Sequence, residues 1–261
     1  MMTLPPERKS ALERGTHPTR NLAECLAIDQ AALLQAVLPE IGLLTALPAV
    51  LAAHRCVASK GISHQIAAIG TAVGTALQAL PKKAAAGASQ RLSQHPSDTV
   101  RSWAAFALSR TPPDCPLQER LLAVRPFAAD LHFGVREWAW MAVRPYIAAE
   151  IELALTQLLD WTSSPDPNLR RFAVESTRPR GVWSEHIGAL KTAPAIALPL
   201  LDAVKADLAR YVQDSVGNWL NDASKTAPEW VSALCGQWRQ LGDPATDRII
   251  DRALRTLRKR G

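Results

Sequence analysis

Apolar residues recur every three or four positions along most of the chain, which is the spacing that one face of an α-helix requires. Leu22, Leu33 and Val37 lie on one such stripe, and Asp29 is a suitable N-cap for its second half. The 19 prolines fall mostly at the edges of the periodic stretches, where they begin or end helices. β-Branched runs are scarce. The pattern therefore predicts an all-α protein of about ten to fourteen helices joined by short turns.

Four short segments resemble one another in the later part of the chain: Asp98–Ala104, Phe133–Ala139, Pro167–Ala173 and Arg210–Val216. Their shared apolar positions are separated by 35, 34 and 43 residues, and these positions are Val100, Val135, Leu169 and Val212. Such intervals are typical of HEAT repeats, in which each helix pair buries its apolar face against the next. We therefore expect a helical N-terminal region over residues 1–90 and HEAT-like repeats over residues 91–261, packed as one continuous α-solenoid. The alternative is a chance similarity between ordinary helices.

Composition excludes several classes of protein. With 48% hydrophobic and 21% charged residues, the chain is neither a disordered nor a fibrous polymer. The four cysteines lie far apart without metal-ligand spacing, so we expect neither disulfides nor a metal site. The longest apolar run covers residues 41–53 and contains Pro48, which is short of the roughly 20 residues that span a membrane. The first 20 residues lack the apolar core of a signal peptide, so we expect a cytoplasmic protein without membrane contact.

The net charge of +6 favours an acidic partner. Near the end of the sequence, four basic residues follow the period of one helical stripe: Arg248, Arg252, Arg255 and Lys259. Double-stranded DNA carries one negative charge per roughly 1.7 Å of its axis, which suits such a stripe. The alternative is an ordinary terminal helix whose basic residues are simply solvated.

Common catalytic signatures are absent, including the phosphate-binding loop, the dinucleotide fingerprint and the zinc protease motif. The six histidines are scattered, and we assign none of them a role.

Tryptophan accounts for 8 of the 14 aromatic residues, and three acids lie close to tryptophans in sequence: Glu137 next to Trp138 and Trp140, Glu175 before Trp183, and Asp222 after Trp219. An acid in apolar surroundings is costly unless something pairs with it or uses it. Glu175 and Asp222 are separated by about one repeat plus four residues, so consecutive repeats could bring both to one concave surface. The alternative is a salt bridge from each acid to an arginine of a neighbouring repeat, with the tryptophans in the core.

Several blocks of sequence resemble the AlkC-like branch of the HEAT-like bacterial DNA alkylation-repair glycosylases. The resemblance covers nearly the whole chain, and its most specific blocks are Glu-Ser-Thr-Arg-Pro-Arg at residues 175–180 and Asn-Trp-Leu-Asn-Asp at residues 218–222. Further matching blocks lie at residues 19–29, 60–64, 200–205 and 252–261.

This resemblance implies a monofunctional DNA glycosylase that needs no cofactor or metal and removes cationic N-alkylated bases such as 3-methyladenine from duplex DNA. Members of the family grip the DNA backbone in a cationic groove and act without fully extruding the lesion. An N-alkylated purine is a good leaving group, so the enzyme mainly stabilises an oxocarbenium-like sugar and positions a water molecule. The expected partner is double-stranded DNA with alkylated bases, bound by a monomer.

The resemblance also implies roles for individual residues. Glu175 and Asp222 face the deoxyribose as catalytic acids, and Glu137 is the third acid. Trp183 packs against the sugar or the cationic base, and the other expected substrate-binding residues are Trp138 and Trp140. Phosphate contacts are assigned to eight basic residues: Arg170, Arg178, Arg180, Lys225, Arg248, Arg252, Arg255 and Lys259.

Two positions depart from the family. Relatives usually carry Arg or Lys where this chain has Gln213 and Asp214, and the loss of two phosphate contacts weakens DNA affinity and its salt dependence. A second hypothesis is therefore a non-catalytic HEAT-repeat protein that binds damaged or branched DNA. A third is a scaffold that binds another protein through its concave face.

Overall fold

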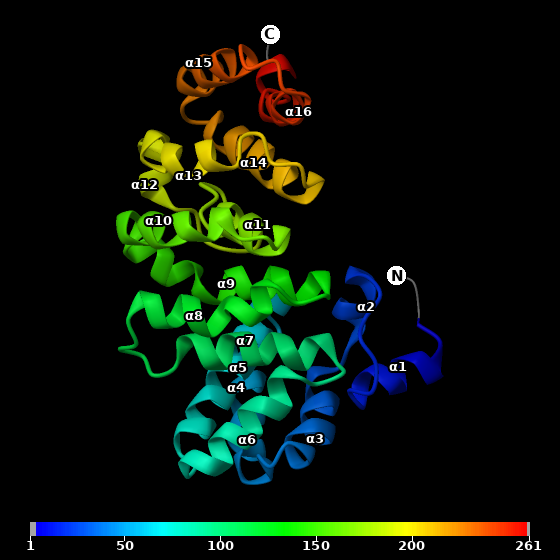
Figure 1. The fold of residues 1–261 in the computed structure, drawn as a ribbon. Helices are drawn as coiled ribbons and strands as arrows, with labels where there is room; N and C mark the ends of the chain where they lie inside the picture. Colours follow the sequence, from blue (N-terminus) through cyan, green and yellow to red (C-terminus); the bar gives the residue numbers. More distant parts are fainter. Residues whose placement is uncertain (1–3, 260–261) are drawn as a thin grey trace. The chain divides into compact units, whose positions relative to one another are not determined.

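The computed structural model describes residues 4–259, and over this range the chain forms sixteen α-helices and four 3-10 helices but no strand (Figure 1). The predicted all-α class is confirmed. The helices outnumber the expected ten to fourteen because several are very short, such as α2 (Leu22–Ala27) and α12 (Gly188–Thr192). Within the described range, every helix is too short or too polar to cross a membrane.

The chain divides into two compact units, an N-terminal unit of residues 1–143 and a C-terminal unit of residues 144–261. The boundary falls inside the long helix α9 (Phe133–Ala149). The expected division near residue 90 stays a prediction.

Helices α1 to α8 and the first part of α9 build the N-terminal unit: α1 (Pro6–Glu13), α2, α3 (Gln30–Glu40), α4 (Leu47–Arg55), α5 (Ile62–Gln78), α6 (Lys82–Ser93), α7 (Asp98–Arg110) and α8 (Leu117–Ala128), with the 3-10 helix η1 (Leu44–Ala46). Asp29 caps α3 as the sequence predicts, because its carboxylate accepts from the Ala31 amide at 2.8 Å. α5 packs closely along α7. A Cβ atom added at Gly70 would lie 2.4 Å from the Cβ atom of Phe106, so this approach requires glycine.

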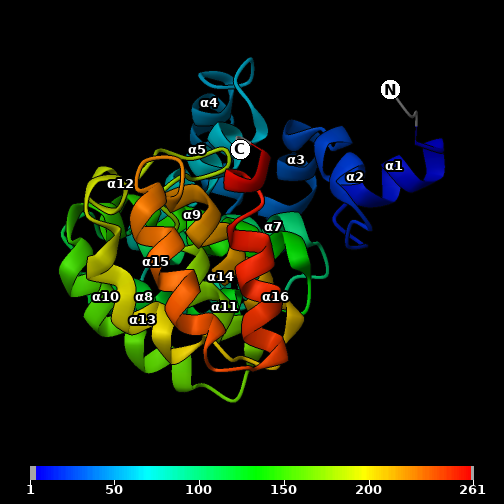
Figure 2. The same ribbon diagram turned by 90° about the horizontal axis from the view of Figure 1, so that it is seen from above.

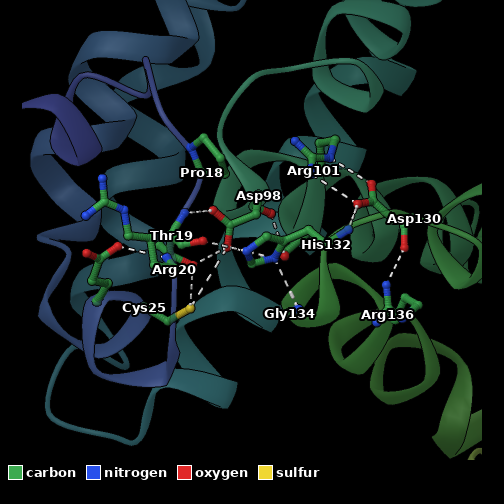
Figure 3. Close-up of polar contacts among 12 residues, drawn as sticks. Pro18, Thr19, Arg20, Cys25, Asp98, Arg101, Asp130, His132, Gly134 and Arg136 are labelled. Atoms are coloured by element: carbon green, nitrogen blue, oxygen red, sulfur yellow. Dashed lines mark hydrogen bonds and ion pairs between the residues drawn. The ribbon is translucent and has the colours of Figure 1, made fainter. Parts of the chain in front are cut away.

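Thr19, in the segment before α2, is hydrogen-bonded to residues at the starts of α7 and α9 (Figure 3). Asp98 accepts hydrogen bonds from the main-chain amide and the hydroxyl of Thr19, at 2.7 and 2.8 Å. His132 Nδ1 faces the Gly134 amide and accepts from it, so the proton lies on Nε2, which donates to the Thr19 carbonyl at 2.7 Å. The buried Asp98 therefore holds the N-terminal helices against α7 and α9.

The four similar segments found in the sequence each lie at the start of a helix, namely α7, α9, α11 (Pro167–Glu175) and α14 (Arg210–Ala223). The fourth residue of the first segment, Arg101, makes a two-point ion pair with Asp130 and donates to carbonyls before its own helix (Figure 3). Arg170 repeats the arrangement with Asp207, at 2.6 and 3.0 Å. Gln213 takes this position in α14. Its amide nitrogen donates to a preceding carbonyl, that of Asp207, and its amide oxygen accepts from Arg248 at 3.1 Å.

The C-terminal unit contains the end of α9 and seven further α-helices: α10 (Ile151–Leu159), α11, α12, α13 (Leu198–Ala203), α14, α15 (Pro228–Arg239) and α16 (Pro244–Ala253). Three 3-10 helices complete it, η2 (Asp160–Ser163), η3 (Pro194–Ala197) and η4 (Leu257–Lys259). α14 packs against both α11 and α16, and α15 lies beside α16 (Figure 2). Trp219 of α14 is completely buried. α11 ends early, at Glu175, and the chain continues as a connection over residues 176–187, which we call the α11–α12 loop.

Candidate functional site

The acids Glu175 and Asp222 are joined by one arginine. Glu175 ends α11, Asp222 lies in α14, and their residues are 5% and 4% exposed. Arg178, in the α11–α12 loop, donates to a Glu175 oxygen at 2.7 Å and to an Asp222 oxygen at 2.9 and 2.6 Å. Consecutive repeats thus bring the two acids to one place, and Asp222 is paired with an arginine of the preceding repeat. The family resemblance assigns Arg178 to a phosphate contact, but in this structure its guanidinium group is bound by both acids.

Further partners complete this network. Glu175 accepts a short hydrogen bond from the Ser215 hydroxyl and lies 3.6 Å from the Arg171 guanidinium. Burial alone would raise the pKa of Glu175, but the charges of Arg171 and Arg178 and the Ser215 hydrogen bond outweigh it, so the pKa is lowered. For Arg178 the balance is similar: burial opposes the charge, but the two acids raise its pKa. The ion pair between Glu175 and Arg178 therefore favours the charged form of both groups.

Lys225 forms the outer edge of the network. Its ammonium lies 2.8 Å from the second oxygen of Asp222. The Lys225 side chain is 35% exposed, whereas those of Arg171 and Arg178 are largely buried. Lys225 is therefore the most exposed member of the network, and the two acids are its most buried charged members.

Three successive carbonyls at the start of the α11–α12 loop accept hydrogen bonds from buried side chains. Arg144 of α9 donates to the Ser176 and Arg178 carbonyls, and the indole of Trp219 donates to the Thr177 carbonyl at 3.0 Å. The remaining guanidinium nitrogen of Arg144 donates to the Glu185 carbonyl, beyond the tip of the loop. Burial and the nearby charge of Arg178 lower the pKa of Arg144 to about 10.

The tip of the loop presents an indole to solvent. Trp183 is 51% exposed and has a φ of +60°, the left-handed region that costs a non-glycine residue about 1–2 kcal/mol. Among residues 4–259, Arg180 has no hydrogen-bonding partner for its buried Nε atom. Burial and the charges of Lys191, Arg180 and Arg144 lower the pKa of His186, which Asp222 opposes. The phosphate contact assigned to Arg180 and the substrate contact assigned to Trp183 stay predictions.

The other residues expected at the substrate belong to the N-terminal unit. Glu137 is half-buried and accepts a hydrogen bond from the Trp140 indole at 2.8 Å. Trp138 and Trp140 are both buried, so contact with a substrate would require their packing to open. The catalytic role of Glu137 and the substrate contacts of these indoles stay predictions.

The basic stripe near the end of the chain departs from the expected single helix. α16 ends at Ala253, so Arg255 follows it in a turn and Lys259 lies exposed in η4. The Asp214 carboxylate forms ion pairs with the guanidinium groups of Arg248 and Arg252, at 2.7 and 3.3 Å.

Asn218 accepts from Arg252 at 2.9 Å and from Arg255 at 3.0 Å. The stripe therefore lies against α14, where one acid partly neutralises it. Arg170 is likewise held by Asp207. The DNA contacts assigned to these residues stay predictions.

Three residues that shape this site were not predicted from the sequence. Arg144 donates to main-chain carbonyls, which every residue type has, so the sequence does not indicate these contacts. Ser215 is a common residue type whose contact with Glu175 cannot be predicted from the sequence. Arg171 follows Arg170 directly and could have been found from its place four residues before Glu175 on the same helix. Among the described residues, no cluster of three or more His, Cys, Asp or Glu side chains could hold a metal ion.

Comparison with known proteins finds matches to parts of this chain. Residues 134–236 match a family model described as DNA alkylation repair enzyme. An uncharacterized protein of Bacillus subtilis (strain 168), YhaZ, is 42% identical over 120 residues, which are 46% of this chain and 33% of that protein. The match thus spans about a third of the length of this curated relative.

Two solved structures share the fold. The alkylpurine DNA glycosylase AlkC of Pseudomonas fluorescens, solved bound to DNA containing an abasic site analog, matches 98% of this chain and 66% of its own, with a TM-score of 0.72 and 23% identity. AlkD2 of Streptococcus mutans matches 80% of this chain and 98% of its own, with a TM-score of 0.60 and 21% identity. These matches confirm the predicted HEAT-like fold.

Proposed function

Because residues 134–236 match the family model described as DNA alkylation repair enzyme, we propose that this protein is a monofunctional DNA glycosylase that removes cationic N-alkylated bases, such as 3-methyladenine, from duplex DNA. The observation that carries the proposal is the pair of carboxyl groups of Glu175 and Asp222, which Arg178 holds together inside the matched segment. The exposed indole of Trp183 and Arg180, whose buried Nε atom has no hydrogen-bond partner, lie on the loop that supplies Arg178.

The reaction needs little more than negative charge beside the sugar. When the bond between C1′ and the alkylated base breaks, the electron pair leaves with the base, which becomes neutral, and the sugar acquires oxocarbenium character. Water then adds to C1′ and loses a proton. A carboxylate that is already ionised stabilises the developing positive charge without a protonation step.

The two acids take different parts in this proposal. Asp222 meets the sugar, because its partner Lys225 is the most exposed cation of the network and can move to a phosphate. Glu175 keeps Arg178 in place from the buried side. Trp183 packs against the cationic base, where a ring face contributes about 0.5–2 kcal/mol, and Arg180 holds a phosphate.

The test is release of 3-methyladenine from methylated duplex DNA by the purified protein. We expect release by the wild type and a loss of at least 100-fold for Asp222→Asn. Asp207→Asn is the matched control, because Asp207 is an equally buried acid paired with Arg170 outside the network. No release by the wild type, or equal rates for Asp222→Asn and wild type, would refute the proposal.

The ion pairing of both acids favours a second candidate, a non-catalytic protein that binds damaged or branched DNA. In that case the network is structural, and the cations of the C-terminal unit bind the backbone. This candidate predicts salt-sensitive DNA binding without base release.

A further inference from the structure

One buried side chain closes the α11–α12 loop at both ends. The three guanidinium nitrogens of Arg144 donate to the carbonyls of Ser176, Arg178 and Glu185, at 3.0, 2.7 and 3.0 Å. Two of these carbonyls precede the exposed tip and the third follows it. The Ile187 amide adds a second link, to the Pro179 carbonyl at 3.1 Å.

From this geometry we infer that Arg144 is a positioning residue for the proposed DNA site: it fixes the α11–α12 loop, which keeps Arg178 between the two acids and holds Trp183 outward. The inference rests on the proposed function for its catalytic consequence. The ordering of the loop itself is a property of the free protein and does not depend on that function.

Only arginine suits this position. A guanidinium offers five donors in one rigid plane and can serve three carbonyls at once, whereas lysine has one nitrogen on a flexible stem. A buried charge is also unfavourable unless its donors are satisfied, so Arg144 has a strong preference for the closed loop. Gly181 contributes by leaving room, since a Cβ atom there would lie 3.0 Å from Arg144 Nε and 2.0 Å from the Ser184 hydroxyl.

The backbone of Trp183 explains why the loop needs such a clamp. A tryptophan in the left-handed region persists only where its surroundings hold it. Without the links from Arg144, the main chain at the tip is free to relax to negative φ, which redirects the indole. Arg178, whose carbonyl is one of the three acceptors, loses a fixed main-chain position at the same time.

The chain supplies a matched control. Arg120 is as buried as Arg144 and clamps a different turn, because it donates to the carbonyls of Ser109, Pro112 and Pro113. Arg120→Lys should therefore disturb a buried guanidinium of the same kind without touching the α11–α12 loop.

The first experiment is amide hydrogen exchange on the free protein, read by mass spectrometry over residues 179–187. We expect exchange at least tenfold faster than wild type in Arg144→Lys and within twofold of wild type in Arg120→Lys. Unchanged exchange in Arg144→Lys, or an equal increase in both variants, would overturn the inference.

The second experiment is single-turnover base excision at saturating enzyme with Arg144→Lys, Trp183→Ala and the double variant. We expect Arg144→Lys to lower the rate at least tenfold alone and by a clearly smaller factor in the Trp183→Ala background, because the part of the effect that acts through the indole is already lost there and only the part that acts through Arg178 remains. Fully additive losses would assign Arg144 to general stability and overturn its positioning role. Absence of excision by the wild type refutes the proposed function, and the exchange result then decides the inference alone.

Discussion

Replacing Glu175 by glutamine tests whether the buried acid network holds the C-terminal unit together. Removing one partner of a buried ion pair destabilises proteins by about 3–5 kcal/mol. Here Arg178 keeps its two contacts to Asp222, and the amide oxygen can still accept one hydrogen bond. Arg171 loses the nearby carboxylate. We therefore expect the lower end of that range, a loss of about 3 kcal/mol from the free energy of unfolding at pH 7.

The loss of stability in Glu175→Gln should be smaller at acid pH than at pH 7. The folded-state pKa of Glu175 is below its ordinary value of 4.5, so the unfolded chain binds a proton more readily. The ionised acid therefore contributes stability that is complete above about pH 4.5 and is lost as pH falls through the lower, folded-state pKa. Glu175→Gln should remove this contribution, so its stability should fall less steeply than that of the wild type on the acid side of pH 4.5.

Urea unfolding followed by tryptophan fluorescence measures both effects, with midpoints and slopes compared from pH 3 to pH 7. Glu229→Gln is the control, since Glu229 is exposed on α15, and it should change stability by less than about 0.5 kcal/mol. A loss below 1 kcal/mol for Glu175→Gln at pH 7, or an acid limb parallel to that of the wild type, would show that the network does not stabilise the fold.

Two further substitutions test the surface and the packing. Asp214→Asn removes the acid that pairs with two arginines of the basic stripe, so we expect DNA affinity to rise about two- to fivefold at low salt, with a steeper salt dependence. The control is Asp251→Asn, which also removes an exposed acid that is paired with an arginine near the end of the chain. Equal effects of the two substitutions on DNA affinity would contradict a specific role for Asp214. Gly70→Ala forces a methyl group against Phe106 and should lower the free energy of unfolding, measured in urea, by about 1–3 kcal/mol. The control is Gly236→Ala inside α15, which should not destabilise the protein because the Cβ position there faces open space. An unchanged free energy of unfolding for Gly70→Ala would show that α5 and α7 can separate freely.

Local periodicity made the helices and repeats predictable. The four similar segments begin at residues 98, 133, 167 and 210, and each of these residues opens a helix in the structure. This worked because the apolar stripe and the preceding proline or polar cap act over only a few residues. The count of helices was too low because short turns of helix, such as the five residues of α12, carry too few positions to show a period.

The surroundings of the candidate site were not predictable in the same way. Arg178 lies three residues after Glu175, which suggests an ion pair, but nothing in the sequence states that Asp222 shares the same guanidinium. Burial decides whether such a group is free or paired, and burial depends on α14 packing over α11. The role of Arg144 was hidden for a further reason, since its acceptors are main-chain carbonyls and any residue type would provide them.

The irregular third interval has a consequence for how such a protein can acquire new surfaces. The distance from Leu169 to Val212 is 43 residues instead of 34 or 35, and the α11–α12 loop lies within it. Lengthening a turn between helices costs only a slowly growing closure entropy and leaves the buried stripes of both helices in register. A helical array of this kind can therefore diversify what it touches by altering a single turn, while selection for folding continues to act on the helices alone.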